Sequence, residues 1–144
     1  MGEAGNGALR LAFDSRLKLE FHGAEITTDA GLLAYRELDQ RLGLTQSAAW
    51  KLVDARTGKN TQHTMLALFR QGVYSRLAGY EDTNDGDYLR IDPAMRWVLG
   101  GRAKKKLAAS TSEMGRFETE FLPTDENMEA LSSLCGTWVD AVHG

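Results

Sequence analysis

Carboxylate side chains are concentrated between residues 81 and 87, where the sequence reads Glu-Asp-Thr-Asn-Asp-Gly-Asp. Clustered oxygen ligands are what Ca²⁺ or Mg²⁺ requires, so metal binding is the first chemistry to test. If Gly86 takes the sixth position of a calcium loop, the first, third and twelfth positions are Glu81, Thr83 and Asp92. Such a loop needs Asp, then Asp or Asn, and finally Glu at those positions. The spacing therefore argues against a calcium loop.

The same acids do not predict phosphoryl transfer by themselves. Two-metal chemistry needs carboxylates from separate parts of a fold to hold two Mg²⁺ ions about 3.5 to 4 Å apart. His22, His63 and His143 are scattered, and no spacing typical of a Ser-His-Asp triad or of a Cys and His metal site is present. We predict no catalytic and no metal-ligating residue. The acids are instead expected to hydrogen-bond their own backbone in turns, cap the next helix and pair with Arg90.

Charge is distributed unevenly along the chain. Between residues 94 and 116 there are six Lys and Arg residues and one acid, whereas residues 117–144 hold six acids and no Lys or Arg. The net charge of −3 argues against a general nucleic-acid binder. A local field, however, guides a charged partner more than the total charge does. Two interpretations stay open, a single DNA-facing surface and a solvated basic loop that balances an acidic helix.

The segment from 97 to 117 is the best candidate for DNA contact. A short helix, a basic connector containing glycine and a second helix match the outline of a helix-turn-helix, whose second helix enters the major groove. Ser112 and Arg116 lie one turn apart near the start of that second helix, and Arg can bond guanine bidentately. Lysines add phosphate affinity without specificity. The predicted DNA-binding residues are Arg102, Lys104, Lys105, Lys106, Ser112 and Arg116. The alternative is a surface helix beside a Lys-rich loop.

Four further bases outside this segment are candidates for secondary DNA contacts or for ordinary solvent-facing positions. They are Arg56, Lys59, Arg70 and Arg76.

Alternating apolar residues between Leu9 and Phe21 predict a half-buried strand or hairpin, with a tight turn at His22-Gly23 and a short return strand over residues 24–26. The first predicted helix begins after a Thr28 cap and ends at Gly43. Its expected apolar face consists of Gly31, Tyr35, Leu38 and Leu42.

The remaining helices follow from spacing and capping signals. A short helix is predicted over 47–54, and the i, i+4 spacing of Met65, Phe69, Val73 and Leu77 predicts a central core helix over 61–80. Asp92-Pro93 is typical of a helix start, and Ser110 with Glu113 has capping-box spacing. A last helix over 124–142 carries a narrow apolar seam, formed by Met128, Leu131, Cys135, Trp138 and Val142.

Together these patterns predict one domain, 1–144, of the mainly α (α+β) class. A β-hairpin element over 8–27 precedes a helical region, 28–142, of about five to six helices that includes the helix-turn-helix-like pair. Cys135 is the only cysteine, and its place on the seam predicts a reduced core thiol. No apolar run reaches the roughly 18 residues of a membrane span, and no signal peptide is visible, so we expect a cytoplasmic protein without membrane contact.

Two segments, Gly79–Pro93 and Ser110–Glu118, resemble the N-terminal region of a family of bacterial insertion-sequence transposases, the group 1 DDE transposases. The similarity also includes Thr28–Leu33 and Arg36–Asp39, so it covers most of the chain in the family's own order. Three residues depart from the family pattern. Gly86 stands where a larger residue such as His is expected, Gly72 where the family often has a bulkier residue, and Glu113 where Thr or Ser is usual.

The resemblance implies the N-terminal fragment of a DDE transposase, which binds double-stranded DNA at transposon ends during DNA transposition and recombination. It also implies that the RNase H-like catalytic core, its acids and the Mg²⁺ they hold are absent from this chain, so no cofactor and no catalytic activity are expected here. Two alternatives stay open, a standalone DNA-binding regulator and a noncatalytic interaction module. Dimerisation through the C-terminal helix would favour the regulator.

Overall fold

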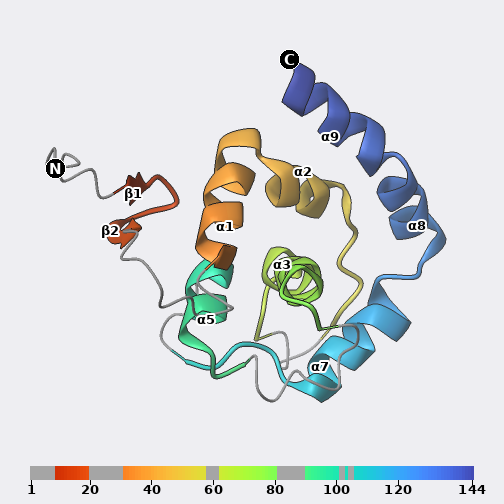
Figure 1. Cartoon of the computed structure of the whole chain (residues 1–144). Coiled ribbons are helices and arrows are strands. Elements are labelled where there is room, and N and C mark those ends of the chain that lie inside the picture. Colours follow the sequence, from red (N-terminus) through yellow and green to blue (C-terminus); the bar gives the residue numbers. More distant parts are fainter. Residues whose placement is uncertain (1–8, 20–30, 58–61, 81–89, 101–102, 104–105) are drawn as a thin grey trace, which may run out of the picture.

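Helix α3 (Met65–Leu77) lies at the centre of the fold, and the other helices surround it (Figure 1). The Thr64 hydroxyl caps its start by accepting a hydrogen bond from the Ala67 amide. Met65, Leu68 and other residues on several sides of the helix are buried. The predicted central core helix is therefore confirmed. Leu77 differs from the expectation, because half of its surface is exposed.

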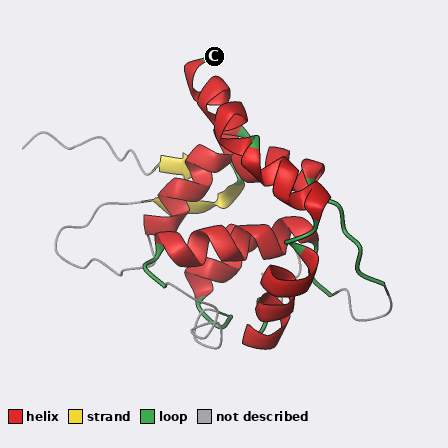
Figure 2. Cartoon of the chain, turned by 90° about the vertical axis from the view of Figure 1, so that its right-hand side faces the viewer, coloured by secondary structure: helices red, strands yellow, loops and turns green. Residues whose placement is uncertain are grey.

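The computed structural model describes residues 9–19, 31–57, 62–80, 90–100, 103 and 106–144. Around α3 are α1 (Gly31–Leu42), α2 (Leu44–Lys51), α5 (Pro93–Leu99), α7 (Thr111–Arg116), the π-helical segment η2 (Phe117–Phe121), α8 (Asp125–Ser132) and α9 (Leu134–His143). With one two-stranded sheet in the described residues, this confirms a mainly helical fold (Figure 2). The predicted acidic turns at 81–87 lie outside the described residues.

Strands β1 (Leu9–Leu11) and β2 (Asp14–Leu19) form an antiparallel hairpin, with Leu9 opposite Leu19 and an irregularity after Arg10. The turn is at Ala12 and Phe13, so of the two predicted interpretations of the alternation, strand or hairpin, the structure has the hairpin. Glu37 of α1 explains its position, because the Glu37 carboxylate accepts hydrogen bonds from the Ala12 amide at 2.6 Å and the Phe13 amide at 3.4 Å. The turn predicted at His22-Gly23, the return strand and the Thr28 cap lie outside the described residues.

The buried face of α1 carries charged residues beside the apolar Leu32. Tyr35 and Leu38, predicted to face the core, are each more than half exposed, whereas Leu32, Arg36 and Asp39 are buried. That part of the prediction was wrong because an apolar pattern cannot reveal buried charges that find partners elsewhere in the fold.

Asp39 organises those partners. Its carboxylate accepts hydrogen bonds from the Thr45 amide at 2.8 Å, the Thr45 hydroxyl at 2.5 Å and the Tyr74 hydroxyl at 2.8 Å. The guanidinium groups of Arg36 and Arg70 lie 3.9 and 4.0 Å from it. Burial, the Asp39 charge and this hydrogen bond raise the pKa of Tyr74 far above its ordinary value. The network joins α1, the start of α2 and α3.

The C-terminal segment is two helices, not the single helix predicted. The helix is interrupted at Ser133 between α8 and α9, and Trp138 of α9 donates from Nε1 to the Leu44 carbonyl at 3.0 Å. Of the predicted seam, Leu131 and Trp138 pack against the core cluster that contains Leu134. Met128 and Val142 are more than half exposed, and Cys135 is exposed, so the prediction of a core thiol was wrong.

Asn127 of α8 is completely buried and fastens this segment to the end of α2. Its side chain accepts a hydrogen bond from the Val53 amide at 2.7 Å and donates to the carbonyls of Val53 at 3.2 Å and Phe121 at 2.8 Å. One side chain thus satisfies three main-chain groups.

Two apolar clusters meet on α3. The first contains Met114 of α7 and Phe117 of η2, and the second contains Met95 and Val98 of α5. The residues joining α5 to α7 pass from one cluster to the other, because Ala108 belongs to the second cluster and Ala109 to the first. α5 and α7 are therefore positioned by different parts of the core.

Candidate nucleic-acid interface

Helix α5 begins and ends as its sequence signals predict. The Asp92 side chain accepts a hydrogen bond from the Met95 amide at 2.8 Å, and Pro93 occupies the first turn. Gly100 ends the helix with a φ of 73°, a conformation that favours glycine.

The connector between α5 and α7 is held against the core in its described part. Arg96 Nε donates to the Ala103 carbonyl at 2.8 Å, and the Ala108 amide donates to the Arg90 carbonyl at 3.0 Å. Ala103 and Ala108 are each 1% exposed. Lys106 is exposed between these anchored points. Its backbone therefore has a defined place in the fold, although the side chain extends into solvent.

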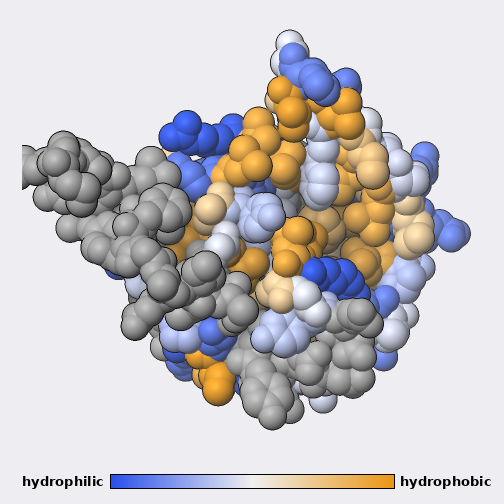
Figure 3. All heavy atoms as spheres, in the orientation of Figure 1, coloured by the Kyte–Doolittle hydropathy of each residue, from blue (hydrophilic) through white to orange (hydrophobic). Residues whose placement is uncertain are grey.

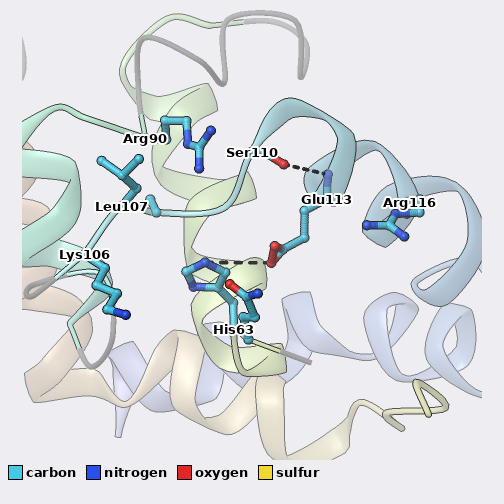
Figure 4. A pocket seen from close by; sticks show the side chains of 9 residues that line it. His63, Arg90, Lys106, Leu107, Ser110, Glu113 and Arg116 are labelled. Carbon is cyan, nitrogen blue, oxygen red and sulfur yellow. Dashed lines mark hydrogen bonds and ion pairs between the residues drawn. The ribbon is translucent and has the colours of Figure 1, made fainter. Parts of the chain in front are cut away.

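Helix α7 starts at Thr111, as predicted, and the Ser110 hydroxyl accepts a hydrogen bond from the Glu113 amide at 3.3 Å. The Glu113 carboxylate, which a capping box would turn back to the Ser110 amide, instead points toward His63 (Figure 4). Its Oε1 lies 3.8 Å from His63 Nε2. The Ser110 half of the predicted box is confirmed, and the Glu113 half is replaced by this contact.

A cavity of about 380 Å³ opens between the connector, α7 and the residues before α3 (Figure 4). Three cationic residues line it against one carboxylate, so it favours anions. Its lining consists of Gln62, His63, Arg90, Lys106, Leu107, Ala108, Ser110, Glu113 and Arg116.

Polar atoms beside this cavity lack hydrogen-bond partners. Among the described residues that line it, Arg90 Nε and Glu113 Oε1 are buried without one. Buried polar groups are usually paired in native proteins, so such atoms are candidates for contact with a bound group. Arg90 Nε is a hydrogen-bond donor and needs an acceptor, whereas Glu113 Oε1 is an acceptor and needs a donor.

A second cavity, of about 160 Å³, lies on the other side of Glu113. Arg56 lines it, and both Glu113 and Arg116 line both cavities. Arg56 also positions His63, because its Nη1 donates to the His63 carbonyl at 2.8 Å. The hydrogen bond to Asp54 raises the pKa of Arg56, and the charges of Asp54 and Glu113 add to this. The same hydrogen bond lowers the pKa of Asp54.

The structure brings two of the predicted DNA-binding residues together, since Lys106 and Arg116 line the larger cavity. Ser112 is exposed on α7 and does not line it. Arg102, Lys104 and Lys105 lie outside the described residues. His63 and Arg90 were missed. No spacing rule connects them with α7, and they reach the cavity only through the packing of the chain around α3.

The secondary candidates have other partners. Arg70 is buried and donates from Nε to the Thr45 hydroxyl at 2.9 Å, so a surface contact for it was a wrong prediction. Burial lowers the pKa of Arg70. Arg76 is exposed but bonds Glu118 through both terminal nitrogens, at 2.9 and 3.2 Å. Arg56 pairs with Asp54, and Lys59 lies outside the described residues.

Within the described residues, no three His, Cys, Asp or Glu side chains gather as the ligands of a metal ion would. The helices in the same part of the chain also include none that is long and apolar enough to cross a membrane.

The chain also matches a known protein family. Residues 9–144 match the model of a family described as transposase DDE domain group 1. The match agrees with the resemblance found in the two sequence motifs. Comparison with curated proteins and with solved structures gives no match.

Proposed function

The chain belongs to the transposase DDE domain group 1 family, and from this premise we propose that it binds double-stranded DNA at the ends of a mobile element. The observation that carries the proposal is the cationic cavity, which is lined by Arg90, Lys106 and Arg116. Cations provide most of the affinity of a protein for duplex DNA, because they neutralise phosphates and release counterions.

We propose that some of these cations contact phosphates and that Arg116 contacts a base. Lys106 and Arg90 contact phosphate, together with Arg102, Lys104 and Lys105 of the connector. Arg116 contacts the edge of a base, and Ser112 lies one turn before it on the same exposed helix.

Helix α7 is the element that we propose for the major groove, as the second helix of a helix-turn-helix would be. In a typical helix-turn-helix the two helices pack against each other, but α7 is held in place differently. α5 and α7 pack in separate apolar clusters, so α7 is held by α3 and η2 rather than by α5. In this proposal the segment supplies DNA recognition, and no described residue is given a part in cleavage.

The test is fluorescence anisotropy with a duplex selected from a random pool and with a scrambled duplex, over a series of salt concentrations. Lys106→Ala should weaken binding to both duplexes similarly and reduce the salt slope by about 1, whereas Arg116→Ala should lose about 1 to 3 kcal/mol of discrimination. Lys51→Ala and Arg41→Ala, at exposed positions on α2 and α1, are the matched controls. Absence of duplex binding at low salt would refute the proposal.

We also propose that two copies associate through the C-terminal helices. Apolar side chains are exposed along this part of the surface (Figure 3), among them Val139 and Val142 of α9, each more than half exposed. Sedimentation of the wild type and of Val139→Lys tests this. A dimer that the substitution dissociates supports the proposal, and a monomer at all concentrations contradicts it.

A further inference from the structure

We infer that Glu113 is a specificity-determining residue, whose carboxylate accepts a hydrogen bond from the exocyclic amino group of a cytosine next to the base contacted by Arg116. This inference rests on the proposed function. It assigns to the same surface a residue that the sequence suggested only as a helix cap.

The charge of Glu113 is opposite to that of the cations around it. A carboxylate among residues that contact phosphate repels the DNA backbone and weakens nonspecific binding. Glu113 nevertheless lines both cavities, beside Arg116 in each. Because the Glu113 carboxylate lowers the nonspecific affinity for DNA, its place beside Arg116 is favourable only if it makes a specific contact with a base.

The hydrogen bonds of the Glu113 carboxylate within the fold are incomplete. The distance of 3.8 Å from Oε1 to His63 Nε2 is too long for a hydrogen bond, and Oε1 has no hydrogen-bond partner among the described residues. Arg56 is affected by the charge of Glu113 but donates its hydrogen bonds to Asp54 and to the His63 carbonyl. Oε1 itself is buried, whereas the Glu113 side chain as a whole is 21% exposed, so in this inference the other carboxylate oxygen, Oε2, contacts the base.

Glu113 and Arg116 both belong to α7. Glu113 and Arg116 lie three residues apart on one helix, and such residues are neighbours on the helix surface. Three residues advance an α-helix by about 4.5 Å. Successive bases of a DNA strand are about 3.4 Å apart along the duplex. The two side chains are therefore spaced to contact neighbouring base pairs.

The choice of cytosine follows from hydrogen-bond chemistry. An ionised carboxylate only accepts hydrogen bonds. In the major groove cytosine presents the N4 amino group as a donor, whereas adenine presents the acceptor N7 beside its amino group. The carboxylate can therefore accept a hydrogen bond from cytosine N4, whereas adenine N7, also an acceptor, repels it.

The experiment is selection of duplexes from a random pool by the wild type, Glu113→Gln, Glu113→Ala and Arg116→Ala, followed by anisotropy on the selected sequences. We expect the wild type to select cytosine beside the position that Arg116→Ala randomises. Glu113→Gln should change only that cytosine position, toward adenine, because an amide can bond adenine bidentately. Its discrimination against other bases should change about 5- to 150-fold, which corresponds to 1 to 3 kcal/mol. Glu113→Ala should abolish the preference there and tighten binding to random duplex.

Two controls separate this role from a structural one. Glu129→Gln removes an exposed carboxylate of α8 and should leave every base preference unchanged. Thermal unfolding of each variant reports on folding, and Glu113→Gln keeps the size of the side chain if Glu113→Ala fails to fold. The inference is overturned if Glu113→Gln keeps all wild-type preferences, or if it weakens all positions equally with a lower Tm. If the wild type binds no duplex, the proposed function fails as well.

Discussion

The side-chain amide of Gln71 satisfies both main-chain hydrogen-bonding groups of Ala109. Nε2 donates to the Ala109 carbonyl at 2.9 Å, and the Ala109 amide donates to Oε1 at 3.0 Å. Both residues are buried, with exposures of 2% and 1%. Ala109 directly precedes Ser110, the cap of α7. The central helix therefore fixes the place where the proposed recognition helix begins.

Replacing Gln71 with Ala should lower the free energy of unfolding by about 3 kcal/mol. The substitution leaves a buried donor and a buried acceptor of Ala109 without partners, and each such group costs about 1 to 3 kcal/mol. Urea unfolding measures the loss. Gln40→Ala, at an exposed position of α1, is the control and should change stability by less than about 0.5 kcal/mol. Equal stability of the two variants would show that Gln71 does not fasten the connector.

Gly72→Ala should stabilise the protein by about 0.5 to 1 kcal/mol. Gly72 lies inside α3, where Ala is favoured over Gly by about this amount. An added Cβ would lie 3.6 Å from Arg76 Nη1, 3.7 Å from Glu118 Oε1 and 3.8 Å from Met114 Cε, which are ordinary contact distances. The midpoint of urea unfolding should rise. A lower midpoint would mean that the neighbouring η2 segment cannot accept even one methyl group.

Stability should fall more steeply above pH 10 in the wild type than in Tyr74→Phe. The pKa of Tyr74 is raised by burial and by Asp39, so the folded state keeps its proton when the unfolded state begins to lose it near pH 10. The unfolded state then binds fewer protons, and the free energy of unfolding decreases as pH rises, by at most about 1.4 kcal/mol per pH unit for this group. Urea unfolding between pH 9 and 11 gives the slopes. Tyr35→Phe changes an exposed tyrosine and should keep the wild-type slope.

Cys135 should react with a maleimide in the folded protein. Its exposure on α9 predicts labelling of one thiol without denaturant, at a rate that urea changes little. Mass spectrometry of the intact protein counts the label, and Cys135→Ser should take up none. If Cys135 reacts only after unfolding, its side chain is buried in the folded protein, as the apolar seam predicted.

Local signals predicted much of this fold. The caps at Asp92 and Ser110, the central helix and the end of α1 at Gly43 all depend on residues close in sequence, and the structure has them where expected. Such signals act within one or two helical turns, so one chain is enough to recognise them.

Long-range partners account for the errors. The hairpin turns at Ala12 because Glu37 binds its amides, and the charged face of α1 is buried because Thr45 and Tyr74 satisfy Asp39. The candidate site also depends on contacts between residues far apart in the sequence. Lys106 and Arg116 were visible as cations, but His63 and Arg90 join them only after the chain has packed around α3.

Asn127 also sets an order of events during synthesis. The Val53 main-chain groups that it satisfies precede it by 74 residues, so they remain without this partner until α8 has left the ribosome. A chain emerging at about 5 to 20 residues per second takes several seconds to supply it. Until then the end of α2 is without its C-terminal attachment, and a nascent chain stopped before residue 127 exposes the apolar surface that α8 would cover. The attachment of α8 to the end of α2 can therefore form only after residue 127 has been synthesised.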